Sequence, residues 1–228
     1  MAEKHFLPIF YTLTKYSIIK MKRIFLLLLV LHGIFFTKAQ IGIPNQTYPE
    51  NAEDISPLLI GEKIDDITLS DLNNKNIKLK ELFSDKPTIL VFYRGGWCPY
   101  CNHQLSGLQE IESQLKTTGY QLVAISTDKP ENLKSSIDKQ KLRYELLSDA
   151  NLELAKSMGI AYKAPQVYHK FLPESTGGMN KDLLLPVPSV FILNKEGEIR
   201  FEYIEPNFKE RISASLLLAV AETIYDSL

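Results

Sequence analysis

Apolar residues in the middle of the chain gather in short continuous runs that polar, helix-like segments separate. Pro87–Tyr93 and Tyr120–Ser126 are runs of this kind, and Ser189–Leu193 is a third. Continuous apolar runs of this length are typical of strands that neighbouring elements cover on both faces. The pattern therefore predicts three buried strands at the centre of the fold.

A helical repeat follows the first buried run. Between Pro99 and Thr117, apolar side chains recur at spacings of three or four residues, at Leu105, Leu108, Ile111 and Leu115. This spacing places them on one face of a helix, and Gly119 is suited to end that helix. The sequence thus predicts a buried strand that leads into a long amphipathic helix.

Weaker signals complete the alternation of strands and helices. Short strands are expected at 67–69, 77–79 and 146–147, a hairpin strand at 198–204, and helices at 130–140, 150–158 and 208–227. Asp128 is placed to cap the helix that starts at Pro130. Alternation of this kind predicts an α/β fold in which helices flank a mixed central sheet.

One long stretch, residues 159–185, shows no regular period and contains the pair Gly177-Gly178. Loops of this length are commonly functional, and a packed element would avoid adjacent glycines. We expect this stretch to form a mobile lid that faces a partner.

The overall charge of −1 conceals an uneven distribution. Residues 1–39 carry six basic side chains and one acidic one, which leaves residues 40–228 with 20 basic and 26 acidic side chains, a net charge of −6. An acidic body does not attract nucleic acid or an anionic membrane. We therefore expect no nucleic-acid partner.

The N-terminal excess of positive charge belongs to a pattern typical of export signals. Met21-Lys22-Arg23 precedes an apolar run, Ile24–Phe36, which Thr37-Lys38-Ala39 follows. This is the order of a secretory signal peptide. A retained membrane anchor is the alternative, but the run is shorter than the ~20 apolar residues that a spanning helix needs.

These features divide the chain into three parts. Residues 1–39 are expected to be a signal peptide, with either Met1 or Met21 as its start, and residues 40–57 a linker. Residues 58–228 are expected to form the α/β domain. The mature protein would then carry no membrane anchor and lie in the periplasm, a compartment in which disulfides form and persist.

The candidate chemistry lies where the first buried strand meets the long helix. Cys98 falls at the start of the helix, where free N–H groups and the positive end of the dipole lower the pKa of a thiol. Pro99 suits the first helical position, since its missing N–H costs nothing there. Cys101 lies one helical turn further on the same face. The pattern predicts a nucleophile, Cys98, with a resolving thiol, Cys101.

Four residues ahead of the nucleophile are candidate supporting groups. Gly95 and Gly96 let the backbone turn tightly, and Trp97 would shield one side of the thiol. Arg94 would favour the thiolate by its charge. A solvated arginine at a strand end is the alternative interpretation of Arg94.

Two other roles for the cysteine pair are weaker. A zinc site needs two further ligands, and only His103 and His169, each best interpreted as a surface residue, lie downstream of the pair. A purely structural disulfide would close a loop too short to constrain the unfolded chain. We therefore expect a redox dithiol without metal or cofactor.

The segment Phe92–Cys101, with the sequence FYRGGWCPYC, resembles the active site of a peroxiredoxin-like branch of the alkyl hydroperoxide reductase/thiol-specific antioxidant (AhpC/TSA) family. Its Cys98-Pro99-Tyr100-Cys101 dithiol also matches that of glutaredoxins, and Trp97-Cys98 is similar to thioredoxin. The resemblance extends from about Ile60 to the C-terminus. It implies a thioredoxin-like fold, antioxidant redox chemistry and supporting roles for Pro99 and Tyr100.

The same resemblance points to a proline opposite the dithiol. Pro186–Ser189 resembles the segment that places a cis-proline there, and Pro188 is the candidate. The sequence itself shows only an X-Pro bond directly before a strand, and most such bonds are trans.

This sequence departs from the family pattern at groups that hold a peroxide. Gly95 stands where peroxiredoxins carry Thr or Ser, and Val187-Pro188 offers no arginine. Missing hydrogen-bond donors would weaken peroxide cleavage. Phe92 also stands about where thioredoxins bury an aspartate.

Thiol–disulfide exchange needs only an exposed thiolate of low pKa, a resolving thiol and a docking surface. We therefore expect a thiol–disulfide oxidoreductase that reacts faster with disulfides than with hydrogen peroxide. A thiol-dependent peroxidase is the alternative, and a non-catalytic binding module a third. The expected electron donor is a thioredoxin-like or membrane protein, and the substrate a disulfide or a peroxide.

Overall fold

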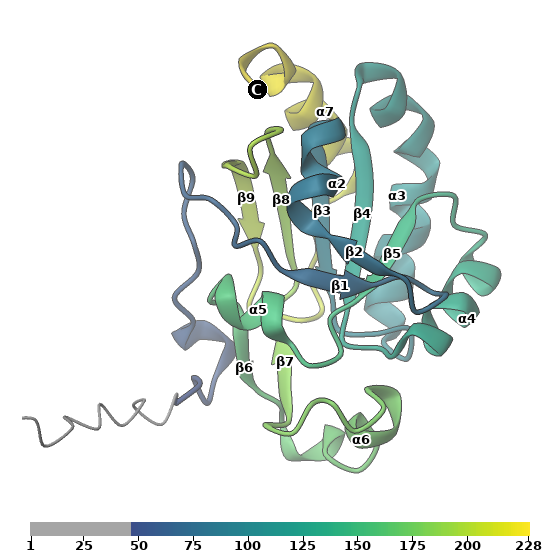
Figure 1. Ribbon diagram of the computed structural model, residues 1–228, viewed down its shortest axis with the longest axis vertical. Helices are drawn as coiled ribbons and strands as arrows, with labels where there is room; N and C mark the ends of the chain where they lie inside the picture. The colour runs from purple at the N-terminus through teal and green to yellow at the C-terminus, as the bar shows by residue number, and fades with distance from the viewer. Residues whose placement is uncertain (1–46) are drawn as a thin grey trace, which may run out of the picture. The chain divides into compact units, whose positions relative to one another are not determined.

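A seven-stranded sheet in the order β2-β1-β5-β4-β3-β8-β9 forms the centre of the computed structural model, which describes residues 47–228 (Figure 1). Its strands are β1 (Thr68–Ser70), β2 (Asn76–Lys78), β3 (Thr88–Tyr93), β4 (Gln121–Ser126), β5 (Glu145–Ser148), β8 (Ser189–Leu193) and β9 (Ile199–Ile204). β3, β4 and β5 are parallel, whereas β8 is antiparallel to β3 and to β9. The predicted mixed α/β sheet is confirmed.

Helices cover both faces of this sheet. The helices are α2 (Leu79–Asp85), α3 (Pro99–Thr118), α4 (Pro130–Gln140), α5 (Glu153–Ser157), α6 (Leu172–Ser175) and α7 (Ala214–Ile224), with short 3-10 turns η1 (Ala52–Asp54), η2 (Gln166–Tyr168) and η3 (Tyr225–Ser227). α3, α4 and α7 pack on one face, and α2 and α5 on the other. Every residue of β3 is buried as a result.

Alternation along β3 divides the core in two. Ile89, Val91 and Tyr93 join the cluster beneath α3 and α7. Leu90 and Phe92 join the cluster beneath α2 and α5. A strand between two helical layers needs apolar side chains at every position, because successive side chains point to opposite faces. This is why its sequence is a continuous apolar run.

The predicted helix at 99–117 is confirmed as α3. Gly119 ends it with a φ of 119°, in the left-handed region, and its N–H donates to the carbonyl of Leu115. A Cβ at this position would meet the ring of Tyr225. Both backbone conformation and space therefore require glycine there.

Several smaller predictions need correction. The strand expected at 77–79 is β2 at 76–78, and the helix α2 that begins at Leu79 was not predicted. The closing helix begins at Ala214, not at 208, because Ser213 caps it by accepting a hydrogen bond from Leu216 N–H at 3.2 Å. Asp128 does not cap α4, whose N-cap residue is Lys129.

The stretch 159–185 is more ordered than the sequence suggested. β6 (Ala161–Lys163) and β7 (Leu184–Pro186) pair as a two-stranded antiparallel sheet, with η2 and α6 between them (Figure 1). Tyr162, Leu172 and Leu185 are the centre of a separate apolar cluster. The irregular course expected for this stretch is wrong, since these residues form short elements around their own apolar cluster.

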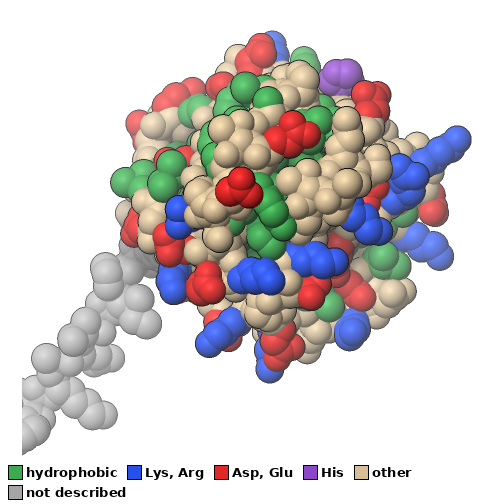
Figure 2. Space-filling view, turned by 90° about the horizontal axis from the view of Figure 1, so that it is seen from above, with side chains coloured by type: hydrophobic (Ala, Val, Ile, Leu, Met, Phe, Trp, Pro, Cys, Tyr) green, Lys and Arg blue, Asp and Glu red, His purple; other side chains and the backbone are tan. Residues whose placement is uncertain are grey.

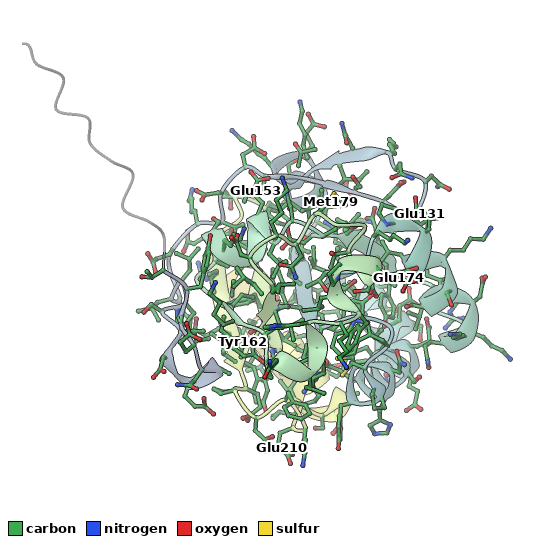
Figure 3. All side chains as sticks on the ribbon, turned by 90° about the horizontal axis from the view of Figure 1, so that it is seen from below. Glu131, Glu153, Tyr162, Glu174, Met179 and Glu210 are labelled. Atoms are coloured by element: carbon green, nitrogen blue, oxygen red, sulfur yellow. The ribbon has the colours of Figure 1, made fainter. Side chains whose placement is uncertain are left out.

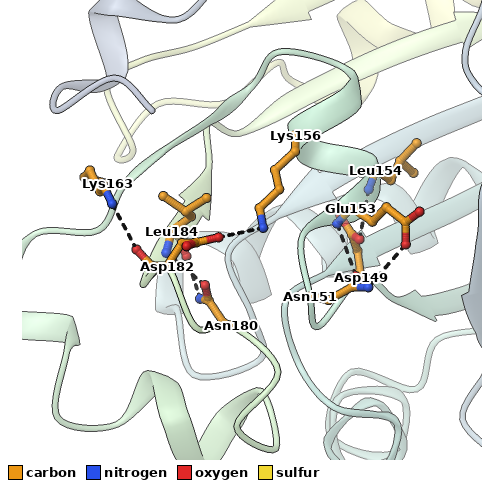
Figure 4. Close-up of polar contacts among 9 residues, drawn as sticks. All are labelled: Asp149, Asn151, Glu153, Leu154, Lys156, Lys163, Asn180, Asp182 and Leu184. Atoms are coloured by element: carbon orange, nitrogen blue, oxygen red, sulfur yellow. Dashed lines mark hydrogen bonds and ion pairs between the residues drawn. The ribbon is translucent and has the colours of Figure 1, made fainter. Parts of the chain in front are cut away.

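Polar contacts fix the turn before β7, and one of them joins it to α5 (Figure 4). Lys156 on α5 donates to the Asp182 carboxylate at 2.8 Å, and Lys163 on β6 donates to its carbonyl at 3.5 Å. The buried Asn180 amide accepts from Leu184 N–H at 2.9 Å and donates to its carbonyl at 2.8 Å. Each end of the turn between α6 and β7 is thereby fixed.

The predicted signal peptide, residues 1–39, lies outside the described residues, as does the first part of the predicted linker. The folded unit begins at Tyr48, before the expected domain start at residue 58. Ala52 is buried, and the carbonyl of Pro49 accepts a hydrogen bond from Lys163 N–H at 2.8 Å. None of the helices in the described part has the length and apolar character that crossing a membrane requires. Acidic and basic side chains are interspersed over the face that Figure 2 shows.

Candidate active site

The two cysteines lie where β3 gives way to α3. Cys98 is the N-cap residue with extended backbone (φ −90°, ψ 115°), and Pro99 follows at the start of the helix. Both side chains are fully buried and both thiols are free. The expectation of an exposed thiolate is therefore wrong: the sulfur of Cys98 lies beneath the surface.

The two thiols differ in acidity. A hydrogen bond from the Cys101 thiol is the main cause that lowers the pKa of Cys98 to about 6, against the opposing effect of burial. The Cys101 backbone N–H and the charges of Arg94 and Arg211 lower it further. Burial raises the pKa of Cys101 well above its usual range, and its hydrogen bond to Cys98 adds to this. Cys98 is thus the thiol that ionises first, and the hydrogen bond from Cys101 is the largest cause that lowers its pKa.

Arg94 lies buried in an aromatic cage. Its guanidinium carbon is 5.0, 4.6 and 4.5 Å from the ring centroids of Trp97, Tyr168 and Phe208, and the residue is only 2% exposed. Within residues 47–228 its Nε and Nη1 groups have no hydrogen-bond partner. The alternative of a solvated arginine is therefore wrong. A buried cation with unused N–H groups lies beside the dithiol, where it favours an anion.

The loop ahead of Cys98 is clamped by the β4–α4 connection. Asp128 Oδ2 accepts a hydrogen bond from Gly96 N–H at 2.6 Å, and Thr127 Oγ1 donates to the Arg94 carbonyl at 3.0 Å. Gly95 has a φ of 145°, and a Cβ there would lie 2.9 Å from Asp128 Oδ1. Asp128 is 1% exposed, and burial raises its pKa to about 6. The role of Asp128 is therefore in this loop and not at the start of α4.

Arg211 is a site residue that the sequence did not indicate. Its Nη2 donates to Cys101 Sγ at 3.3 Å, and its Nε donates to Gln104 Oε1 at 3.0 Å. The residue lies far along the chain, in the irregular segment before α7, and no local motif marks it. The sequence predicted only a closing helix at 208–227, a range that includes this position, and that helix begins at Ala214.

The remaining predicted residues are spread around the dithiol. Tyr100 is 39% exposed, and its ring lies 5.9 Å from that of Phe208. Trp97 packs edge-on against Phe171, with the ring centroids 4.8 Å apart. All peptide bonds within the described residues are trans, so the suggestion of a cis bond at Pro188 is wrong. Its carbonyl instead accepts a hydrogen bond from Glu205 N–H at 3.0 Å.

The two histidines lie outside the site. His103 is exposed on α3, and a ring nitrogen of His169 lies 2.7 Å from the Ala164 carbonyl. In the part of the chain that the structure describes, no three His, Cys, Asp or Glu side chains are grouped as a metal site would require.

Figure 3 looks onto the end of the molecule formed by α6 and the neighbouring loops, with Tyr162, Glu174 and Glu210 labelled. These residues come from β6, from α6 and from the segment before α7. Two of these segments supply the rings that cage Arg94: Tyr168 lies between β6 and α6, and Phe208 ahead of α7. The stretch 159–185 and the C-terminal segment thus both pack on Arg94.

Comparison with known proteins gives consistent matches. A model of the AhpC/TSA family matches residues 60–202. The putative peroxiredoxin bcp of Haemophilus influenzae is 28% identical over 145 residues, which are 64% of this chain and 85% of that protein. Peroxiredoxin Bcp of Escherichia coli is 30% identical over 106 residues, 46% of this chain and 67% of that protein.

A solved structure shares the fold. Reduced Prx3 from Vibrio vulnificus, in complex with H₂O₂, superimposes with a TM-score of 0.61 at 21% identity and covers 72% of this chain and 99% of its own. The solved structures that match are thioredoxin-fold peroxiredoxins, so the predicted thioredoxin-like fold is confirmed.

Proposed function

The chain belongs to the AhpC/TSA family, and we propose that it is a thiol-dependent peroxidase in which Cys98 attacks the peroxide and Cys101 resolves the product. The observation that carries this proposal is the fully buried Cys98 of lowered pKa beside a buried guanidinium with unused N–H groups. The peroxiredoxin relatives support the same class of oxidoreductase.

Burial of the sulfur favours a small oxidant. A thiolate must approach the atom it attacks in line, and in the reduced state, in which both thiols are free, a protein disulfide would have to bring its own backbone down to Cys98. Cys98 and Cys101 are both 0% exposed. Hydrogen peroxide or a small alkyl hydroperoxide has no such bulk. We therefore place the peroxidase before the thiol–disulfide oxidoreductase. The sequence favoured the opposite order, because it led us to expect an exposed thiolate.

Arg94 supplies donors that the sequence comparison found missing. When the Cys98 thiolate attacks one peroxide oxygen, the O–O bond breaks and the other oxygen leaves as hydroxide or alkoxide, which then takes a proton. Donors aimed at that developing charge lower the barrier. Gly95 and Val187-Pro188 offer no such side chain, whereas Nε and Nη1 of Arg94 are free to donate. The oxidised product is the sulfenic acid of Cys98.

Thiol–disulfide oxidoreduction is the second candidate. The Cys98-Pro99-Tyr100-Cys101 spacing favours it, because a resolving thiol one turn away releases a mixed disulfide rapidly. In either case we propose a thioredoxin-like or membrane protein as the electron donor. The export signal expected in residues 1–39 supports a periplasmic location.

The test compares oxidants on the reduced protein by stopped flow. Trp97 is the only tryptophan of the chain and lies next to the dithiol, so its fluorescence reports oxidation directly. We expect larger second-order rate constants for H₂O₂ and for cumene hydroperoxide than for oxidised glutathione. Cys98→Ser serves as the silent control. A rate constant for the disulfide equal to or above those for the peroxides would reject the peroxidase in favour of the second candidate.

A further inference from the structure

We propose that Arg211 is a catalytic residue of the dithiol, which stabilises the Cys101 thiolate whenever the Cys98–Cys101 disulfide forms or breaks. The inference rests on the proposed dithiol chemistry and deepens it. It assigns a role at the second sulfur, for which the family resemblance offered no side chain.

The geometry of Arg211 is fixed on several sides. Nη2 donates to Cys101 Sγ at 3.3 Å, Nε to Gln104 Oε1 at 3.0 Å, and Nη1 to the Phe208 carbonyl at 2.8 Å. The next residue, Ile212, is buried in the core beneath α3 and α7. A guanidinium held by three different acceptors keeps its orientation, so the N–H toward sulfur is pre-set before the reaction.

Cys101 needs such a partner because its surroundings oppose ionisation. Burial is the largest cause that raises the pKa of this thiol, and the neighbouring Cys98 raises it too. The charge of Arg211 acts in the opposite direction. Only the thiolate attacks or leaves in exchange reactions. Arg211 therefore acts on the ionised form of Cys101, which both half-reactions require.

Cys101 is a thiolate in two steps of the proposed cycle, disulfide formation and disulfide reduction. In the oxidative step, the Cys101 thiolate attacks the sulfur of Cys98 sulfenic acid; the S–S bond forms, the S–O bond breaks, and hydroxide leaves and takes a proton to give water. In the reductive step, a thiolate of a dithiol reductant attacks Cys98, and the S–S electron pair passes to Cys101. The second thiolate of the reductant then releases Cys98, and the reductant is oxidised to its disulfide. Arg211 faces the negative charge on Cys101 in both steps.

The same contact explains why Arg94 and Arg211 are not equivalent. The Arg94 side chain packs against the rings of Trp97, Tyr168 and Phe208, and its Nε and Nη1 have no hydrogen-bond partner among residues 47–228. The N–H of Arg211, in contrast, reaches Cys101 Sγ. We assign Arg94 to the peroxide step and Arg211 to the disulfide steps. Each arginine should therefore affect a different phase of the cycle.

The experiment separates these phases with Arg211→Met and Arg211→Lys. Reduced protein is mixed with excess H₂O₂, and Trp97 fluorescence follows sulfenic acid formation and then disulfide formation. In Arg211→Met we expect the second phase to slow by at least roughly tenfold, as the loss of a hydrogen bond to a charged group implies. The first phase should slow far less, because the charge of Arg211 is the smallest of the causes that lower the pKa of Cys98. Its pH profile should shift upward. Arg211→Lys, which keeps the charge, should recover part of the rate.

A second readout and a matched control variant test the role of Arg211 further. Slow resolution leaves the sulfenic acid open to a second peroxide, so mass spectrometry should find more sulfinic acid on Cys98 in Arg211→Met. Arg143→Met is the matched control: Arg143 is an exposed arginine whose Nη2 lies 3.8 Å from Glu112 on α3. It should behave like the unsubstituted protein.

The reductive step tests Arg211 even if peroxide proves to be the wrong substrate. Protein oxidised with diamide is mixed with dithiothreitol, and Arg211→Met should be reduced at least roughly tenfold more slowly. Failure of H₂O₂ to oxidise any variant, together with this slowing, would reject the peroxidase and support Arg211. Unchanged disulfide formation and reduction in folded Arg211→Met would overturn the inference. An equal slowing of the peroxide phase and the disulfide phase would overturn it as well.

Discussion

At the scale of single residues, the site depends on two arginines that meet the dithiol from different directions. Arg94 comes from the end of β3, four positions before Cys98, and Arg211 from the segment ahead of α7. A buried guanidinium is costly unless an anion or an aromatic face compensates it. Three rings surround Arg94, and the Cys98 thiolate is the anion that completes its environment.

We predict that Arg94→Met raises the pKa of Cys98 and slows peroxide attack by roughly a hundredfold, as the loss of one preorganised donor does elsewhere. The pKa of Cys98 is measured by the pH dependence of its alkylation by iodoacetamide. Arg94→Lys keeps the charge but lacks the planar fork, so it should restore the pKa more fully than the rate. Arg200→Met, at a partly exposed arginine 3.5 Å from Glu198, is the control. An unchanged pKa in Arg94→Met would contradict the prediction.

The sequence predicted the two cysteines and their order of acidity, because a helix start after a buried strand is a local pattern. It did not predict Arg211 or the role of Asp128. Both contacts join segments far apart in the chain, Arg211 with Cys101 and Asp128 with Gly96. No periodicity or spacing carries that information. The burial of Cys98 was missed as well, because it depends on packing within the core cluster and not on the local pattern.

At the scale of elements, the segment from β6 to β7 packs on one side of the site. Tyr168 of η2 packs on Arg94, and Phe171, directly before α6, packs on Trp97. The sequence indicated a loop here because its elements are short: the strands have three residues each and α6 has four. Patterns that short have no recognisable period, and the tertiary contacts supply the order.

We predict that the segment from β6 to β7 resists proteolysis unless the two hydrogen bonds between the Asn180 side chain and Leu184 are removed. Asn180→Ala leaves the N–H and the carbonyl of Leu184 without partners, and each lost hydrogen bond costs about 1 kcal/mol. Trypsin should then cut after the exposed Lys181 well before the rest of the domain, whereas the unsubstituted protein should be cut there slowly. Asn151→Ala, at an exposed asparagine, is the control. Rapid cleavage after Lys181 without any substitution would favour the mobile lid after all.

At the scale of the whole molecule, the alternation of elements predicted the α/β class and the central strands correctly. The continuous apolar runs at β3, β4 and β8 became the buried middle of the sheet. The pairing of β1 with β5 and the division of helices between the two faces were not predictable from local patterns. Both features depend on which apolar faces pack together when the chain folds.

The predicted export signal concerns the chain as a whole. We expect the mature protein to begin at about Gln40, because a small residue, Ala39, ends the basic and apolar segments as a cleavage site requires. N-terminal sequencing of protein recovered from a periplasmic fraction gives the answer. Arg23→Glu, which weakens the basic start, should reduce export, whereas Lys63→Glu within the domain should not. An intact Ile24–Phe36 run in the recovered protein would reject the signal peptide in favour of an anchor.

Two buried carboxyl groups make the stability of the fold depend on pH in an unusual direction. Burial raises the pKa of Asp128 to about 6 and that of Asp149 to about 7. Gly96 N–H offsets this for Asp128, as Ala155 and Leu154 N–H do for Asp149. A carboxyl whose pKa is higher in the folded state than in the unfolded state binds protons on folding. Their charged forms therefore destabilise the fold at pH 8, and this cost decreases as the pH falls through the two folded-state pKa values toward the unfolded value of 3.8.

We predict that the free energy of unfolding, measured by urea denaturation, is larger at pH 5 than at pH 8. Asp128→Asn should remove part of this dependence and stabilise the protein at pH 8, by roughly 3 kcal/mol at most, since each pKa unit corresponds to about 1.4 kcal/mol. The asparagine oxygen still accepts from Gly96 N–H, so the loop keeps its clamp. At pH 5 the difference between the variant and the unsubstituted protein should be about half as large, because Asp128 is then mostly protonated in the folded state only. Asp85→Asn, at an exposed carboxylate on α2, is the control. An Asp128→Asn variant less stable than the unsubstituted protein at pH 8 would mean that the hydrogen bond from Gly96 outweighs the cost of burying the charge.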